Sequence, residues 1–406
     1  MAEHQEVGHR VAYWRTRRGM TRKHFADLVD RSVSWVEKVE AGDRRLVRLP
    51  MIQKVAEALQ VDWRILVDES EAEEATRLPD AAEIQAIKTA LARYEMQSQP
   101  SGLDGAPDLG SLAQHVEYVQ EAFLASDFAV VGTALPKLIR DCQHAVRLHR
   151  GADRCEAASL LVMVYKVTSS TLHKFGSHEL AWLAADRAVL TADIAGDPVS
   201  LARAARCAGR ALMSNGLPGE ALDLIKRTTA RLESTVATAS RELLCLVGMM
   251  CLAGEIAAAR EGDADTAKTM HDKADAVADR LGVDFNDRTT AFGKANVALH
   301  RVSSLVRLGD GRAALVLAES LNTAALARLP RERRVNHLLD VAQAHRQCGD
   351  AGRAVAALRE ADATAPQEIR RRPVARDLIA ELSATTTDPE VSSRLRQLAA
   401  NAGLSL

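Results

Sequence analysis

The residues best suited to chemistry in this sequence are the basic side chains near its start. Residues 8 to 50 hold eleven Lys and Arg against five Asp and Glu, whereas the whole chain of 406 residues has a formal net charge of -1. Guanidinium and ammonium groups displace counterions from phosphates, and they donate hydrogen bonds to O6 and N7 of guanine. The local charge therefore favours a DNA-binding module, although an ordinary solvated surface can have the same composition.

Patterns that would indicate catalysis or metal binding are missing from the sequence. It contains no glycine-rich phosphate loop, no nucleophile elbow and no HExxH pair among its 12 His. The six Cys form no CxxC pair, and neither Cys245 with Cys251 nor Cys142 with His144 and His149 has metal-ligand spacing. We therefore expect no enzyme activity, no metal ion and no cofactor.

Targeting and membrane segments are also missing. The sequence does not open on a signal peptide, and it has no long apolar run free of charges. We expect a cytoplasmic protein with reduced thiols and no membrane contact.

The basic side chains must be positioned by the segment from Thr21 to Gly42, which has the pattern of two short helices joined by a tight turn. Thr21 is a suitable N-cap for the first helix, and the turn passes through Asp30 and Arg31. Either Ser32 or Ser34 caps the second helix, since Ser34 and Glu37 have the spacing of a capping box. The first helix has one apolar face formed by Phe25, Ala26 and Val29, and in the second helix Val36 and Val39 are expected to face the core.

The same helical pattern extends in both directions. A helix with Val7, Val11 and Trp14 on its inner face precedes the segment and ends at Gly19. Pro50 stands at the first turn of a later helix, where its missing N–H costs nothing. Five short helices are thus predicted within about 65 residues.

Residues 7 to 66 resemble the helix-turn-helix domain of phage-repressor and Xre-type transcription regulators. The sequence departs from this family at Asp30, where the family usually has Gly. The residues that carry the resemblance are Gly8, Arg15, Gly19, Thr21, Phe25, Ala26, Val36, Val39, Glu40, Ala41, Gly42 and Leu59.

The resemblance implies that the second helix of the motif enters the major groove with its N-terminal residues at the base edges. Lys38 would donate to guanine, and Val33 would contact a thymine methyl group. Two roles are open for Trp35, because its ring can pack on the sugar-phosphate backbone or on the protein core. The full set of implied DNA-binding residues is Arg22, Ser32, Val33, Ser34, Trp35, Lys38, Arg44 and Arg45, with Arg22, Arg44 and Arg45 at phosphates and Arg44 alternatively at a base.

Arg15 and Glu40 match family positions that form a buried ion pair, so the resemblance implies a structural role for both. After this domain, assigned to residues 1–70, comes an acidic run at 69–74. Residues 80–96 form one amphipathic helix, either a connector or a dimerisation helix. Residues 97–111 have linker composition, so 71–111 is assigned as a connection.

Residues 112–406 read as almost continuous helix and contain an internal repeat. Residues 338–366 resemble a tetratricopeptide repeat, and looser copies precede them. The repeat glycines Gly176, Gly216, Gly262, Gly309 and Gly349 are 40, 46, 47 and 40 residues apart, which exceeds the usual period. We predict an all-α protein, in which a five-helix helix-turn-helix domain precedes an α-solenoid capped by residues 112–150 and 368–406.

A solenoid of this type has a concave face lined by the first helix of each hairpin, by analogy with the repeat. Arginines there would suit a carboxylate, and amides would suit a peptide backbone. The alternative to a ligand-binding groove is a basic helix face that is only solvated. The candidate effector-binding residues are Lys166, Arg203, Arg206, Arg210, Asn296, Asn336 and Gln343.

The two-part layout resembles the peptide-pheromone-sensing regulators of Gram-positive bacteria and many actinobacterial regulators. It implies a homodimeric transcription regulator that binds double-stranded DNA and responds to a peptide or a protein ligand in the solenoid groove. The alternative is a helical-repeat adaptor that binds another protein and uses the DNA-binding head as a secondary tether.

Overall fold

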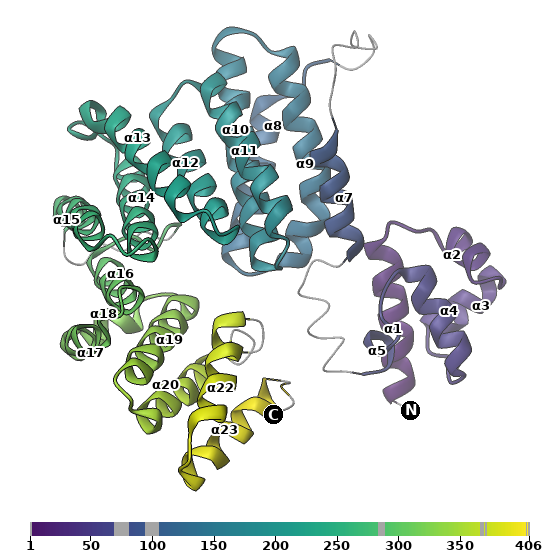
Figure 1. The fold of residues 1–406 in the computed structure, drawn as a ribbon. Coiled ribbons are helices and arrows are strands. Elements are labelled where there is room, and N and C mark those ends of the chain that lie inside the picture. Colours follow the sequence, from purple (N-terminus) through teal and green to yellow (C-terminus); the bar gives the residue numbers. More distant parts are fainter. Residues whose placement is uncertain are drawn as a thin grey trace. The chain divides into compact units, whose positions relative to one another are not determined.

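A computed structural model of the chain describes residues 2–68, 81–93, 105–282, 289–365, 369, 372–402 and 404 (Figure 1). Every regular element in these ranges is an α-helix, so the predicted all-α class is confirmed. The chain divides into two compact units, Met1–Ala195 and Gly196–Leu406, which we call unit 1 and unit 2. The acidic run at 69–74 lies outside the described residues.

Unit 1 begins with the five predicted short helices. They are α1 (Ala2–Arg17), α2 (Arg22–Leu28), α3 (Val33–Glu40), α4 (Leu49–Leu59) and α5 (Arg64–Val67). Thr21 caps α2, because its side chain accepts a hydrogen bond from the amide of His24. Trp14, Phe25 and Leu59 are fully buried at the centre of the shared core.

Gly8 is needed where α1 crosses α3. A Cβ atom at this position would lie 2.1 Å from the carbonyl oxygen of Val39, which is closer than real Cβ atoms approach backbone. The two helix axes therefore come together only because residue 8 has no side chain. This contact explains physically why Gly8 belongs to the motif.

The rest of unit 1 consists of longer helices. They are α7 (Ala81–Ala92), α8 (Leu109–Leu124), α9 (Phe128–Leu148), α10 (Gly151–Lys174) and α11 (His178–Ala195). Helix α7 lies within the segment predicted as a connector or dimerisation helix, and it packs on α9 with Ile87 and Leu91 fully buried. Most of the predicted linker, residues 97–104, lies outside the described part of the chain.

Unit 2 also consists of α-helices in its described residues. They are α12 (Pro198–Ser214), α13 (Pro218–Val236), α14 (Arg241–Arg260), α15 (Ala264–Leu281), α16 (Lys294–Arg307), α17 (Gly311–Ser320), α18 (Thr323–Ala327), α19 (Arg331–Gln347), α20 (Ala351–Thr364), α22 (Pro373–Thr385) and α23 (Pro389–Asn401). Helices that follow one another pair as hairpins, for example α12 with α13, α14 with α15, and α19 with α20 (Figure 1).

The five repeat glycines predicted from the sequence all sit at the same structural position. Each follows the first helix of a hairpin and has a left-handed backbone, with φ between 76° and 84°. Only glycine adopts this conformation without a steric penalty, so these residues end the first helix and turn the chain back. The spacing exceeds the usual period because first helices such as α10 and α14 reach 24 and 20 residues.

A further hairpin, α8 with α9, lacks the glycine. Ser126 occupies the equivalent position with φ 64°, and Asp127 caps α9 just as Asp263 caps α15. The sequence predicts an end cap here and not a hairpin, because this turn lacks the glycine that marks the other hairpins. The Asp N-cap that follows the turn was the signal that could have revealed the hairpin.

Ser126→Gly should stabilise the chain, because glycine removes the left-handed strain of a side chain at this turn. We expect the free energy of unfolding to rise by about 0.5–1 kcal/mol. Urea unfolding followed by circular dichroism measures the change. The reverse replacement, Gly216→Ser at the matching turn of unit 2, is the control and should destabilise; a loss of stability in Ser126→Gly would contradict the assignment.

One described helix, α14, is long and apolar enough to cross a membrane. Its apolar window is 83% buried inside the protein, where α12, α13, α15 and α16 surround it. Burial among these helices accounts for its composition. A Cβ at Gly248 would meet the ring of Phe292 at 2.1 Å, which shows how tightly this core helix is packed.

Candidate nucleic-acid interface

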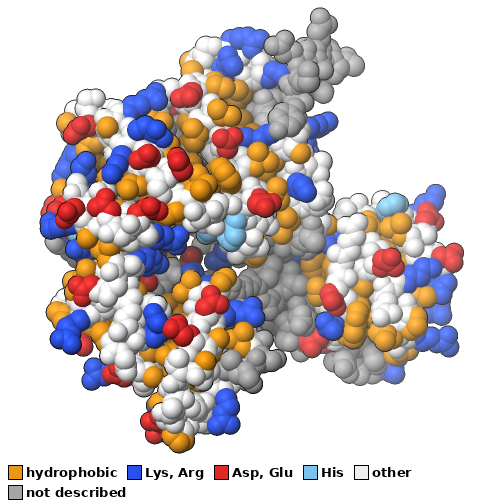
Figure 2. Space-filling model, in the orientation of Figure 1, with side chains coloured by type: hydrophobic (Ala, Val, Ile, Leu, Met, Phe, Trp, Pro, Cys, Tyr) orange, Lys and Arg blue, Asp and Glu red, His pale blue; other side chains and the backbone are white. Residues whose placement is uncertain are grey.

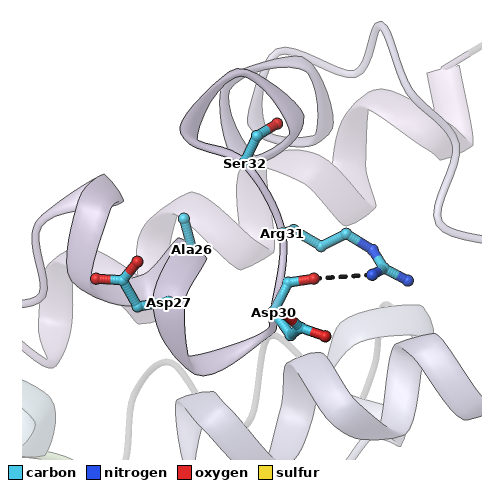
Figure 3. Close-up of a pocket in the computed structure, with 5 residues that line it drawn as sticks. All are labelled: Ala26, Asp27, Asp30, Arg31 and Ser32. Carbon is cyan, nitrogen blue, oxygen red and sulfur yellow. Dashed lines mark hydrogen bonds between the residues drawn. The ribbon is translucent and has the colours of Figure 1, made fainter.

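The turn between α2 and α3 sets the direction of the helix expected to read DNA. Asp30 has φ 55°, so it adopts the left-handed conformation that the related family usually assigns to glycine. Aspartate tolerates this conformation better than most residues. The Arg31 guanidinium donates to the carbonyl of Asp30 at 2.8 Å (Figure 3). Asp30 and Arg31 line a pocket together with Ala26, Asp27 and Ser32. The predicted tight turn is therefore present, although Asp30 stands where the family usually has Gly.

Helix α3 begins at Val33, and Ser32 is its cap. The Ser32 hydroxyl accepts a hydrogen bond from the amide of Trp35 at 3.1 Å. Ser34 lies one residue inside the helix, so the alternative capping box formed by Ser34 and Glu37 is wrong. The physical reason is that Ser32 keeps the extended backbone that an N-cap requires, with φ -77° and ψ 154°.

The two faces of α3 differ sharply. Val36, Val39 and Glu40 are buried, whereas Val33, Ser34 and Lys38 are exposed. The exposed residues follow the helical period, so they share one side of the helix. Arg44 and Arg45, just beyond α3, are exposed as well. Figure 2 shows Lys and Arg side chains along the outer edge of this domain.

Trp35 does not belong to the exposed face. Only 8% of its surface is exposed to solvent, and it packs in the core of the five helices. The Arg31 guanidinium lies 6.0 Å from its ring centroid. Its inclusion among the DNA-binding residues is therefore wrong. The indole lies on the inner side of α3 beside Val36, where burial of its large apolar surface stabilises the domain.

The expected ion pair between Arg15 and Glu40 is present and has a third member. Arg15 contacts both carboxylate oxygens of Glu40, with Nε 2.5 Å from Oε1 and a terminal nitrogen 3.2 Å from Oε2. The Nε of Arg22 lies 2.8 Å from Oε2. One buried carboxylate thus joins α1, α2 and α3, and Arg22 has a structural partner that the phosphate assignment did not foresee.

The two arginines determine the ionisation of Glu40. Burial alone would raise the pKa of this carboxyl, but the hydrogen bonds and positive charges of Arg15 and Arg22 together outweigh burial and hold its pKa below the ordinary value. The carboxylate therefore stays charged at neutral pH. Because the folded pKa is depressed, its stabilisation is present above the unfolded pKa of about 4.3 and is lost as the pH falls through the folded pKa.

Glu40→Gln should weaken the domain in a pH-dependent way. At neutral pH we expect the free energy of unfolding to fall by about 2–4 kcal/mol, because two guanidinium groups lose their buried charged partner. The difference from wild type should disappear in acid, where the wild-type carboxyl is protonated. Unfolding curves at a series of pH values measure this difference in the free energy of unfolding. Glu37→Gln, at an exposed position of the same helix, is the control. An equal loss of stability at every pH would refute the charge-based explanation.

Sequence reasoning missed Glu37 as a candidate contact. It is exposed on the same side of α3 as Val33 and Lys38, four residues after Val33. A carboxylate at this point can accept a hydrogen bond from cytosine N4. The helical spacing contained this signal, but the capping-box hypothesis had assigned Glu37 another role.

The candidate effector-binding residues fall into three groups. Lys166 belongs to unit 1, where its ammonium lies 5.3 Å from the Phe123 ring centroid. Asn296 has no exposed surface and its amide nitrogen lies 3.5 Å from the sulfur of Met249, so it belongs to the core and its assignment to an open groove is wrong.

The remaining candidates are partly exposed in unit 2. Arg203 pairs with Glu242, Asn336 accepts a hydrogen bond from Arg372, and the Gln343 amide lies beside Arg346. Arg206 and Arg210 stand one turn apart on α12. Among the described residues, no group of three His, Cys, Asp or Glu is arranged to hold a metal ion.

Comparison with protein families agrees with the geometry of the five N-terminal helices. Residues 6–69 match the family of the helix-turn-helix domain. The match covers the whole of α1 to α5 apart from the first residues of α1, including the Glu40 ion pairs and the exposed face of α3. It does not extend into the longer helices, and no curated protein matches the chain.

Two solved structures show distant similarity. One is PlcR of Bacillus thuringiensis in complex with the peptide PapR7 and DNA, at 12% identity and a TM-score of 0.28, covering 68% of this chain and 95% of that one. The other is the apo form of the competence regulator ComR from Streptococcus vestibularis, at 10% identity and a TM-score of 0.23, covering both chains fully.

Proposed function

We propose that this protein is a sequence-specific DNA-binding transcription regulator. The observation that carries the proposal is the helix-turn-helix domain at residues 6–69, whose α3 exposes Val33, Ser34 and Lys38 while the opposite side anchors the helix. In this motif the N-terminal part of the second helix reads base edges in the major groove.

Within this proposal each exposed residue has a chemical role. Lys38 donates to guanine, Val33 contacts a thymine methyl group and Glu37 accepts from cytosine. Arg44 and Arg45 neutralise phosphates, and Arg22 does so with the half of its side chain that remains exposed beside Glu40. Ser32 and Ser34 lie at the start of α3, where their hydroxyls can reach bases or phosphates.

We further infer that the protein acts as a homodimer on a partly palindromic site, because a single short helix reads few base pairs. The helical hairpins after residue 111 would sense an effector and change the spacing of the two DNA-binding domains. The domain assignment of residues 1–70, 71–111 and 112–406 belongs to the same proposal. The rival function is a helical-repeat adaptor that does not depend on specific DNA binding.

Lys38→Ala should weaken specific DNA binding by about tenfold to a hundredfold, because a base contact of this kind is worth about 1–3 kcal/mol. A gel shift of the full chain against DNA from upstream of its own gene measures the change. Raised salt should weaken wild-type binding further, since phosphate contacts release counterions.

Lys268→Ala is the matched control, because Lys268 is an exposed lysine of α15 that pairs with Asp272 along the same helix. Its DNA affinity should equal that of wild type. Specific binding that survives Lys38→Ala unchanged would refute the reading role of α3, and absence of specific binding by wild type would favour the adaptor.

A further inference from the structure

A buried ion pair joins the N-terminal domain, formed by α1 to α5, to the longer helices of unit 1. Arg17, the last residue of α1, meets Glu83 in the first turn of α7. Its Nε lies 2.7 Å from Oε1 of the carboxylate and its Nη2 lies 2.8 Å from Oε2, so the two planar groups pair edge to edge. Both residues belong to unit 1, although 66 positions separate them in the sequence.

Water has little access to this pair. The side chain of Arg17 is 5% exposed and that of Glu83 is 8% exposed. Ion pairs at the surface contribute little, because solvent screens the charges and the side chains lose conformational freedom. In a buried pair, removal of one member leaves the other charge without a partner, which is strongly unfavourable. The pair therefore constrains the two helices that carry it.

Other side chains anchor each end of the pair. The Arg17 guanidinium lies 4.7 Å from the ring centroid of Trp14, which is fully buried in the core of the N-terminal domain, and it donates to the Tyr13 hydroxyl at 3.1 Å. On the other side, Oε1 of Glu83 lies 3.0 Å from the hydroxyl of Thr133 in α9. Since α7 also packs on α9, the connection runs from the core of the domain to the hairpin of α8 and α9.

The reading face of α3 stays open while the pair is formed. Val33, Ser34 and Lys38 are exposed, and the contact is made instead through the end of α1. Within the described residues, the helices of the N-terminal domain pack mainly on one another. The ion pair thus fastens the domain to the hairpin without covering the face expected to meet DNA.

We propose that Glu83 is a positioning residue for DNA binding, which acts through Arg17 to fix the orientation of the N-terminal domain on the first hairpin. The paired edges of a guanidinium and a carboxylate hold direction as well as distance. A dimer needs this direction, because its two reading helices must meet half-sites on one side of the DNA. The inference deepens the proposed function and rests on it.

The holding role is tested on the full chain without DNA. One spin label is placed on Cys155 of α10 and another on the cysteine introduced by Glu57→Cys in α4, since both positions are exposed. Cys348→Ser removes the other exposed thiol. Double electron–electron resonance should give one narrow distance distribution in this background, and a clearly broader distribution once Glu83→Gln is added.

Asp141→Asn is the matched control, because Asp141 pairs with the exposed Lys137 along α9 alone. It should leave the distribution narrow. Arg17→Lys tests the pair from its other side and should broaden the distribution, because lysine keeps the charge but lacks the planar fork. A broad distribution in the background chain, or a narrow one in both pair variants, would overturn the proposal.

The DNA-binding role is tested by gel shift with DNA from upstream of the protein's own gene, after footprinting of its half-sites. A second DNA carries about 5 extra base pairs between the half-sites, which turns one half-site to the opposite side of the duplex. The insertion should weaken binding by wild type at least about tenfold, and binding by Glu83→Gln less than about threefold.

A purely structural role of Glu83 would weaken binding to both DNAs alike. If Glu83→Gln discriminates between the two DNAs as strongly as wild type does, the positioning role is wrong while the proposed function stands. Failure of wild type to bind either DNA specifically is instead a failure of the proposed function, and the distance distributions still decide whether the pair holds the domain.

Discussion

The buried carboxylate of Glu40 is the interaction on which the N-terminal domain depends. It lies on the inner side of α3 and is held by Arg15 of α1 and Arg22 of α2. A charge in this position is costly unless its partners are fixed, so the pairing sets how the three helices lie together. With Gly8 allowing α1 to approach α3, the contact turns the opposite side of α3 outward.

The rest of the chain follows a different constraint. Each helical hairpin exposes an apolar face that a neighbouring hairpin must cover, so the helices stack in an array. The turns recur with the same left-handed residue, which is glycine in five hairpins and Ser126 in one. These turns return the chain at the same point of each hairpin.

The lysine and arginines around α3 are exposed at the surface of the N-terminal domain. Exposed cations of this kind suit the extended phosphate backbone of DNA.

The sequence by itself determined the all-α class, the five short helices, the Arg15–Glu40 pair and the phase of the glycine turns. These features follow from local rules of periodicity, capping and backbone freedom, and from landmarks of a known domain family. Tertiary structure alone decided that Ser32 caps α3, that Trp35 and Asn296 are buried, and that Arg22 joins Glu40. The reason is that burial and pairing depend on which helices meet, and residues far apart in the chain, such as Met249 and Asn296, become neighbours only through packing.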